Sequence, residues 1–265
     1  MFHQGIIFLL ASFTCVFGDI GSSSKLATPH VLPNATVQNK NTNSFSEADY
    51  RKIFSFTKKT KIYQHFSYEE MRARIINVTT WEVPLDIKNS FPLYLAGYDY
   101  DKRPVWVFEV GKVDFRTIIA QGEEKVAQAR RYLFRVVSNI IKSFVVMDTP
   151  EEEIREAVFI FDMEGASLGQ VDYAPSWAEF ARLIRKYWDF TIQFVGGVIV
   201  LNANYVAKLA VDVARPVVGA LLERVEIYGS NKNFYLPKLL KRMSIKNIPP
   251  WYGGSKDFKP LIVLS

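Results

Sequence analysis

Hydrophobic spacing from residue 105 onward predicts strands that alternate with helices. Short apolar runs typical of buried strands occupy residues 105–110, 157–161, 196–201 and 225–228. Between the first two runs, residues 122–147 carry apolar positions at helical spacing, namely Val126, Ala129, Leu133, Val136, Val137, Ile140 and Phe144. Strands connected by helices form right-handed crossovers and a mainly parallel sheet. We therefore predict an α/β fold, with a mainly parallel sheet flanked by helices.

Two capping patterns mark the starts of further helices. Ser67 is followed three residues later by Glu70, and Ser176 by Glu179. Both pairs fit the capping box, in which serine and glutamate side chains satisfy the free backbone N–H groups of a first helical turn. The second of these helices would carry the apolar residues Trp177, Phe180, Leu183, Ile184 and Tyr187.

A short amphipathic helix is predicted from Asn204 to Ala214, just before Pro216. Its apolar stripe consists of Val206, Leu209, Ala210 and Val213, and its opposite stripe of Lys208, Asp212 and Arg215. Such a helix either packs on an ordinary core or forms a lid over an apolar cavity, and periodicity alone fits both.

The N-terminal residues have a different character. Residues 1–18 hold an apolar run that is too short to span a bilayer, and we interpret them as a signal peptide with cleavage after Gly18. The alternative is a hydrophobic arm on a cytoplasmic protein. Residues 19–45 are rich in Ser, Thr, Asn and Pro and are expected to be a flexible leader. Residues 46–87 are predicted to be a basic helical segment.

The signal peptide would determine the covalent chemistry of the mature chain. The only cysteine, Cys15, lies inside it, so a secreted mature chain has no disulfide and no thiol chemistry. Asn34 and Asn77 begin glycosylation sequons, which matter only if the chain enters the secretory path. We expect a glycan on Asn34 rather than on Asn77, because Asn34 lies in the predicted leader.

Candidate catalytic residues do not form a complete set. Gly165, Ser167 and Gly169 form a G-x-S-x-G pattern after a predicted strand, as in a serine hydrolase. All three histidines precede Ser167, whereas a hydrolase of that class needs a histidine after its serine. Asp162 and Glu164 could bind magnesium as in a phosphotransferase, but the sequence has no glycine-rich phosphate-binding loop to accompany them. No Cys/His set has the spacing of a zinc site. We predict no catalysis, cofactor or metal, with a hydrolase at Ser167 as the alternative.

Six segments resemble the motifs of the CRAL-TRIO lipid-binding family, in that family's order. They are Asp99–Val105, similar to D-x-D-G-R-P-V; Val158–Gly165, which holds D-x-x-G; Val200–Ala203, similar to I-I-N-x-P; Arg215–Pro216, similar to K-P-F; Val225–Gly229; and Ile248–Gly254, similar to L-P-x-x-Y-G-G. Lys102 stands where the family has glycine, and Asn204 where it has proline. The motifs cover roughly residues 88–256, and we assign residues 88–265 to this domain.

The resemblance implies a sheet that encloses one hydrophobic ligand behind a mobile gate helix, without a cofactor. The expected function is binding and transfer of a small hydrophobic molecule or lipid by a secreted monomer; the alternative is a module that sequesters lipid without exchange. The ligand-binding candidates are Phe108, Leu133, Phe159, Phe161, Ser167, Phe180, Ile184, Phe194, Val200, Tyr205, Leu209 and Val213.

Charge adds an expectation about partners. The net charge of +6 favours anionic partners, and no nucleic-acid motif is present, so we expect transient contact with anionic membranes. The basic candidates for this contact are Lys208, Arg215, Lys238, Lys241 and Arg242. In phosphatidylinositol-binding relatives a Lys or Arg opens the strand after the gate, and Arg224 matches it. Gln193 aligns with the glutamate that assists it there, so we expect weak phosphatidylinositol selectivity.

Overall fold

The computed structural model describes residues 44–167, 182–183, 186–205, 219 and 222–264. The predicted signal peptide, Asn34 and most of the predicted lid helix lie outside these residues. Only parts of the predicted helix after Ser176 fall within them.

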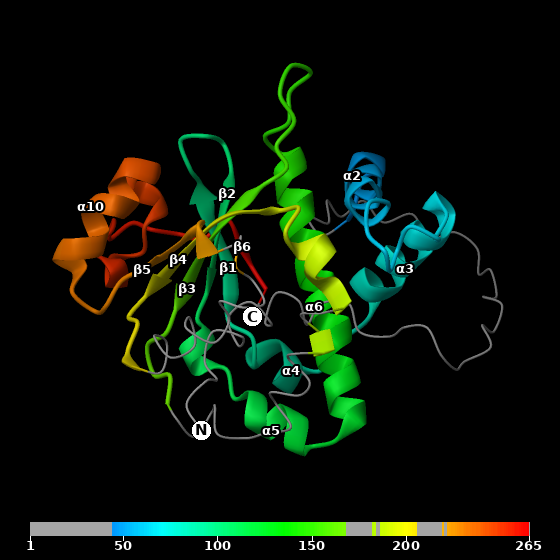
Figure 1. The fold of residues 1–265 in the computed structure, drawn as a ribbon, viewed down its shortest axis with the longest axis horizontal. Helices are drawn as coiled ribbons and strands as arrows, with labels where there is room; N and C mark the ends of the chain where they lie inside the picture. The colour runs from blue at the N-terminus through cyan, green and yellow to red at the C-terminus, as the bar shows by residue number, and fades with distance from the viewer. Residues whose placement is uncertain (1–43, 168–181, 184–185, 206–218, 220–221, 265) are drawn as a thin grey trace.

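A six-stranded mixed sheet forms the centre of the molecule (Figure 1). The strand order is β5-β4-β3-β2-β1-β6, in which β2 to β5 are parallel and both β1 and β6 pair antiparallel. The strands are β1 Leu93–Tyr98, β2 Pro104–Phe108, β3 Ala157–Asp162, β4 Val195–Leu201, β5 Val225–Ile227 and β6 Ile262–Val263. The predicted mainly parallel sheet is confirmed, and its four parallel strands lie where the sequence pattern places them.

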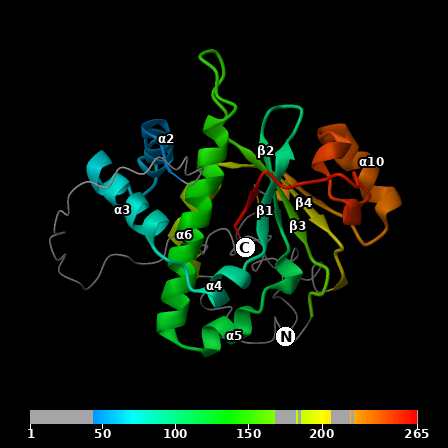
Figure 2. The same cartoon turned by 180° about the vertical axis from the view of Figure 1, so that it is seen from behind.

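Helices lie on both sides of this sheet, as the two opposite views show (Figures 1 and 2). The long helix α6 flanks one side and α10 the other. The helices are α2 Glu47–Thr57, α3 Tyr68–Thr80, α4 Leu85–Asn89, α5 Phe115–Ala120, α6 Glu123–Val145 and α10 Lys232–Arg242, with 3-10 turns η2 Val110–Lys112, η3 Ile245–Asn247 and η4 Pro250–Tyr252. The predicted helix over 122–147 is confirmed as α6, and all seven of its predicted apolar positions are buried.

Alternation along β3 divides the core into two layers. Phe159 and Phe161 join the layer that contains the buried side of α6, whereas Val158 and Ile160 join the layer that contains α10. Successive side chains of a strand point to opposite faces of a sheet, so a strand buried on both faces is a nearly continuous apolar run. All six residues of β3 are buried.

The N-terminal helices pack against α6. The Phe56 ring of α2 lies 5.8 Å from the Phe144 ring of α6 and 6.5 Å from the Phe194 ring, which directly precedes β4. At the start of α3, the predicted capping box is confirmed, because Ser67 and Glu70 exchange side-chain to backbone hydrogen bonds. The segment 46–87 therefore supplies one wall of the core that α6 shares with the sheet.

The turn between β1 and β2 is organised by a buried carboxylate. Asp99 accepts hydrogen bonds from the backbone N–H groups of Asp101 and Arg103, and its Oδ2 pairs with the Arg103 guanidinium at 2.8 Å. Lys102 sits inside this turn with φ of 61°, in the left-handed region that favours glycine.

Replacing Lys102 with glycine is expected to stabilise the protein. Relief of the left-handed conformation should contribute about 1 kcal/mol to the free energy of unfolding. The exposed Lys102–Glu152 ion pair would be lost, at a cost of a few tenths of a kcal/mol, about the value of a surface pair. Urea denaturation of Lys102→Gly and Lys102→Ala measures the difference. Equal stabilities for the two variants would show that the backbone conformation carries no penalty.

Candidate functional site

A buried hydrogen-bond network holds the carboxyl ends of β3 and β4 together. It consists of Asp162, Asn202 and Tyr252 and is called the Asp162 network. Asp162 is 3% exposed; its Oδ1 accepts from Asn202 Nδ2 at 2.7 Å and from the backbone N–H of Glu164 at 2.9 Å, and its Oδ2 accepts from the Tyr252 hydroxyl at 2.7 Å. Three segments separated by 40 and 90 residues thus meet on one side chain.

Burial keeps the Tyr252 phenol of this network protonated. Burial raises the pKa of the Tyr252 phenol far above its ordinary value, and the neighbouring Tyr94 and Asp162 add to that shift. The phenol therefore remains a hydrogen-bond donor to Asp162 at physiological pH. Both carboxylate oxygens accept from protein donors, so the Asp162 side chain links β3, the residue after β4 and η4.

Glycines allow the turn after β3 to pack closely. A Cβ on Gly111, in η2, would lie 2.1 Å from the Glu164 carbonyl oxygen, which no structure tolerates. Gly165 has φ of 84°, a conformation that L side chains rarely adopt. The glycine of the D-x-x-G motif is thus required by the path of the chain as it leaves β3.

A further hydrogen bond beside this network joins the starts of two long segments of the chain. Asn204 Nδ2 donates to the Ala166 carbonyl at 2.8 Å, so the chain leaving β4 is tied to the chain leaving β3. From these points the chain continues into residues 168–181 and 206–218, which lie outside the described residues. The ligand-binding and head-group candidates Phe180, Ile184, Leu209, Val213, Lys208 and Arg215 all lie outside the described residues too.

An apolar face extends along the sheet from this anchor. It consists of Phe108, Phe159, Phe161, Phe194 and Val200, all buried in the layer that α6 shares. Neighbouring rings contact one another in a chain: Phe108 to Phe161 at 6.3 Å, Phe161 to Phe159 at 6.3 Å, and Phe159 to Phe194 at 6.3 Å between centroids. Aromatic surface of this kind favours an apolar neighbour.

The structure thus brings together five of the predicted ligand-binding residues, and Leu133 of α6 belongs to the same buried layer. Ser167 and Tyr205 are instead exposed, Tyr205 by 63%, where the two long segments leave the strands. The residues of the Asp162 network were not predicted as site residues, although each stands in a family motif.

Arg224 lies where the parallel strands begin, at the opposite end of the strands from the Asp162 network. It precedes β5, and its Nη1 donates to the Val195 carbonyl at 2.7 Å and lies 3.4 Å from Glu156 Oε1. Gln193 Nε2 donates to the Asp189 carbonyl at 2.8 Å. The acid that pairs with Arg224 is therefore Glu156, a residue that the sequence reasoning missed.

Other candidate chemistry can be assessed within the described ranges. No group of three or more His, Cys, Asp or Glu side chains there could hold a metal ion. Nor does that part of the chain contain a helix long and apolar enough to cross a membrane. Asn77 lies exposed in α3, and its side-chain oxygen accepts from Arg131 Nη2 at 2.9 Å.

Comparisons with known proteins agree with this geometry. Residues 88–254 match the CRAL/TRIO domain. The chain is 25% identical over 187 residues to the SEC14 cytosolic factor of Yarrowia lipolytica, across 68% of this chain and 36% of that protein's length. Among solved structures it resembles the crystal structure of Sfh5, with a TM-score of 0.52 and 15% identity, covering 82% of this chain and 80% of the other. This structural likeness bears on the fold alone.

Proposed function

The chain belongs to the CRAL/TRIO domain family, and from this premise we propose that it binds one small hydrophobic molecule or lipid and transfers it between membranes. The observation that carries the proposal is the apolar face together with the Asp162 network beside it. The face offers buried aromatic surface. The network holds together the ends of β3 and β4, and the predicted lid follows β4 in the chain. The proposed activity requires neither catalysis nor a cofactor.

Burial of the ligand explains why transfer would need a membrane. Each methylene taken from water contributes about 0.8 kcal/mol, so a lipid of many methylenes would leave for bulk water only slowly. Exchange would then occur where the protein touches a bilayer.

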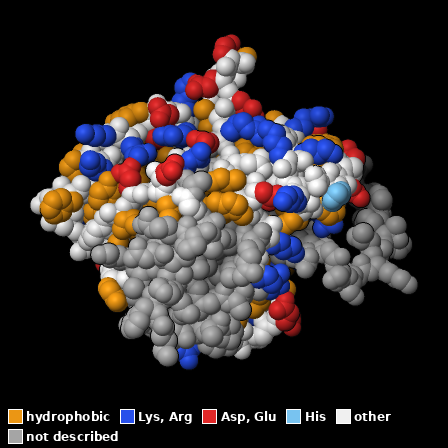
Figure 3. All heavy atoms as spheres, in the orientation of Figure 1, with side chains coloured by type: hydrophobic (Ala, Val, Ile, Leu, Met, Phe, Trp, Pro, Cys, Tyr) orange, Lys and Arg blue, Asp and Glu red, His pale blue; other side chains and the backbone are white. Residues whose placement is uncertain are grey.

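A contact surface of suitable composition covers α10. Phe234 is 72% exposed and Leu240 is 37% exposed, and Lys238 and Lys241 are exposed on the same helix. Figure 3 shows hydrophobic and basic side chains next to each other on this side of the molecule. Apolar side chains that enter the interface, beside lysines that attract anionic head groups, are typical of peripheral membrane contact. Arg242 contributes less, because it pairs with Glu226.

A vesicle-to-vesicle transfer assay with a labelled lipid tests the proposal. The wild-type chain is expected to accelerate transfer, and Leu209→Asp to lose retained ligand, because a charge would enter the apolar stripe of the predicted lid. Asp212→Ala, on the opposite stripe, serves as the control and should keep its ligand. Ligand retained by the wild type without acceleration of transfer would favour the sequestering alternative.

Arg224 is proposed to assist contact with anionic membranes. Removing its charge should weaken association with anionic vesicles by a factor of about 2 to 5 at low salt, since a basic residue near such a surface contributes about 1 kcal/mol. At high salt the difference should disappear. Vesicle sedimentation of Arg224→Gln measures the effect, with Lys259→Gln as the control, at an exposed position just before β6 on the opposite edge of the sheet. Equal association of the wild type and Arg224→Gln at low salt would remove Arg224 from the mechanism.

The ion pair with Glu156 changes the reason for expecting weak phosphatidylinositol selectivity. Gln193 need not hold Arg224, because Glu156 and the Val195 carbonyl already orient it. We retain the proposal that selective phosphatidylinositol transfer is weak, since Arg224 is occupied. Efficient, selective transfer of phosphatidylinositol over a neutral lipid would contradict it.

Export is proposed on the basis of the N-terminal apolar run. A mature chain that begins at Asp19, recovered from the medium of a secretory host and sequenced from its N-terminus, would support it. Protein that keeps Met1 in the cytosol would refute it and would agree with the word cytosolic in the relative's name.

A further inference from the structure

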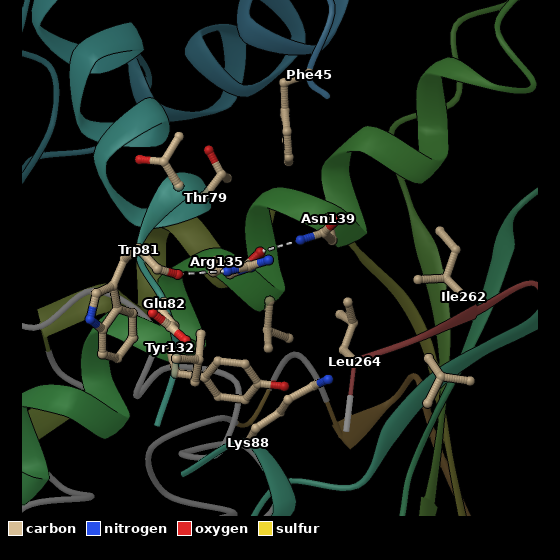
Figure 4. A pocket seen from close by; sticks show the side chains of 14 residues that line it. Phe45, Thr79, Trp81, Glu82, Lys88, Tyr132, Arg135, Asn139, Ile262 and Leu264 are labelled. Carbon is tan, nitrogen blue, oxygen red and sulfur yellow. Dashed lines mark hydrogen bonds between the residues drawn. The ribbon is translucent and has the colours of Figure 1, made fainter. Parts of the chain in front are cut away.

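A cavity lies between the N-terminal helices, α6 and the C-terminal strand, and none of the five residues of the apolar face lines it. Its volume is about 400 Å³, and it is bounded by the end of α3, the α3–α4 connection, α6 and β6 (Figure 4). In the sheet, β6 is the edge strand opposite β5, so this cavity lies at the β6 edge of the layer that also holds the apolar face. Its walls are formed both by the N-terminal helices and by the C-terminal strand.

The cavity contains an unpaired polar group. Tyr132 of α6 is 3% exposed, its hydroxyl has no hydrogen-bond partner, and the hydroxyl points into the cavity (Figure 4). A buried donor without a partner is costly, and most buried hydroxyls are paired. Burial also raises the pKa of this phenol, so it stays protonated and able to donate.

Two basic side chains line the same cavity. Arg135 donates from Nη1 to the Trp81 carbonyl at 3.0 Å, and within the described residues neither Arg135 nor Lys88 forms an ion pair. One acid, the exposed Glu82, also lines the cavity, so the side chains leave an excess of one positive charge. The remaining wall is mixed: Phe45, Ile262 and Leu264 are apolar, whereas Thr79, Thr80 and Asn139 are polar.

We propose that this cavity binds a small amphipathic anion, whose acid group accepts from the Tyr132 hydroxyl and pairs with Arg135 and Lys88. The acid is a carboxylate or a phosphate monoester, both of which match a guanidinium. The body is a compact aromatic or short alkyl group, which the volume accommodates. Bound there, the anion contacts α3, α6 and β6 together and stabilises the attachment of the N-terminal helices.

Calorimetric titration of the full chain tests this site with three probes that share one body: 4-phenylbutyrate, 4-phenylbutyl phosphate and the neutral 4-phenylbutanol. At least one anion is expected to bind ten-fold or more tightly than the alcohol, and the stronger of the two identifies the preferred acid. Failure of both anions to bind the folded protein, or equal binding of the alcohol, would overturn the proposal.

Variants then locate the binding. Tyr132→Phe is expected to weaken the preferred anion five- to ten-fold while leaving the melting temperature unchanged or higher, because it removes an unpaired hydroxyl. Tyr235→Phe is the matched control: its hydroxyl is also buried and unpaired, but it lies on α10, and binding should not change. Lys88→Gln should weaken binding as well. Equal binding by the wild type, Tyr132→Phe and Lys88→Gln would show that the anion enters elsewhere, including the apolar face, and would end the proposal without affecting lipid transfer.

Discussion

Replacing Asp162 with alanine is expected to lower the free energy of unfolding by about 3 to 4 kcal/mol. The substitution leaves the Tyr252 hydroxyl, the Asn202 amide and the Glu164 N–H without their acceptor in a buried setting. Hydrogen bonds to a charged group contribute about 1.5–3 kcal/mol each, and losses within one network are not additive. Urea denaturation followed by circular dichroism measures the change.

Controls separate the network from a general effect of losing a carboxylate. Asp257→Ala, at an exposed position, should change stability by no more than about 0.5 kcal/mol. Tyr252→Phe removes one bond of the network, and a double-mutant cycle with Asp162→Ala should reveal coupling of about 1 kcal/mol or more. A loss below about 1 kcal/mol in Asp162→Ala, or no coupling to Tyr252, would contradict the proposed role of the network as an anchor.

Replacing Lys52 with alanine is expected to cost about 2 to 3 kcal/mol. The Lys52 ammonium is 6% exposed and lies 2.8 Å from both Asp148 Oδ2 and Glu153 Oε1, so it ties α2 to the loop before β3. Breaking a buried pair leaves its partner unpaired, which costs more than the pair itself contributes. The partial exposure of the two acids places the estimate below the range for fully buried pairs. Lys59→Ala, in the exposed turn after α2, should change stability little.

The same cluster predicts a pH dependence. Burial favours a raised pKa for Glu153, but the hydrogen bond and charge of Lys52 outweigh it and hold the pKa below its ordinary value of 4.5. A carboxyl whose pKa is lowered on folding contributes stability that is fully present above its unfolded pKa and is lost as pH falls. Wild-type stability should therefore decline below about pH 4.5 more steeply than that of Lys52→Ala. Parallel pH profiles for the two proteins would refute this linkage.

The sequence predicted the elements whose side chains follow a clear period. The seven apolar positions assigned to the helix over 122–147 are all buried in α6, and the fully apolar run at Ala157–Phe161 is β3. The two antiparallel strands, β1 and the edge strand β6, were not predicted. Strand β6 has only two residues, too few to show a period, and its pairing with β1 joins segments far apart in the chain.

The hydrogen-bond partners in the candidate site could not be predicted, because they are far apart in the sequence. Asn202 and Tyr252 lie 40 and 90 residues from Asp162, and only the fold brings them together. The sequence reasoning considered only Gln193 beside Arg224 and did not identify Glu156. In a parallel sheet the starts of β3, β4 and β5 lie side by side, and this places Glu156 and the Val195 carbonyl next to Arg224.

Native mass spectrometry of the full chain, purified without detergent, tests most directly whether this protein holds a hydrophobic ligand. The account predicts a complex with one small hydrophobic molecule per chain, released by organic solvent and restored by incubation with lipid vesicles. Phe161→Asp, which places a charge in the apolar face, should not bind the ligand even if the variant folds. Folded wild-type protein that repeatedly carries no ligand, and that takes up none from vesicles, would contradict the account.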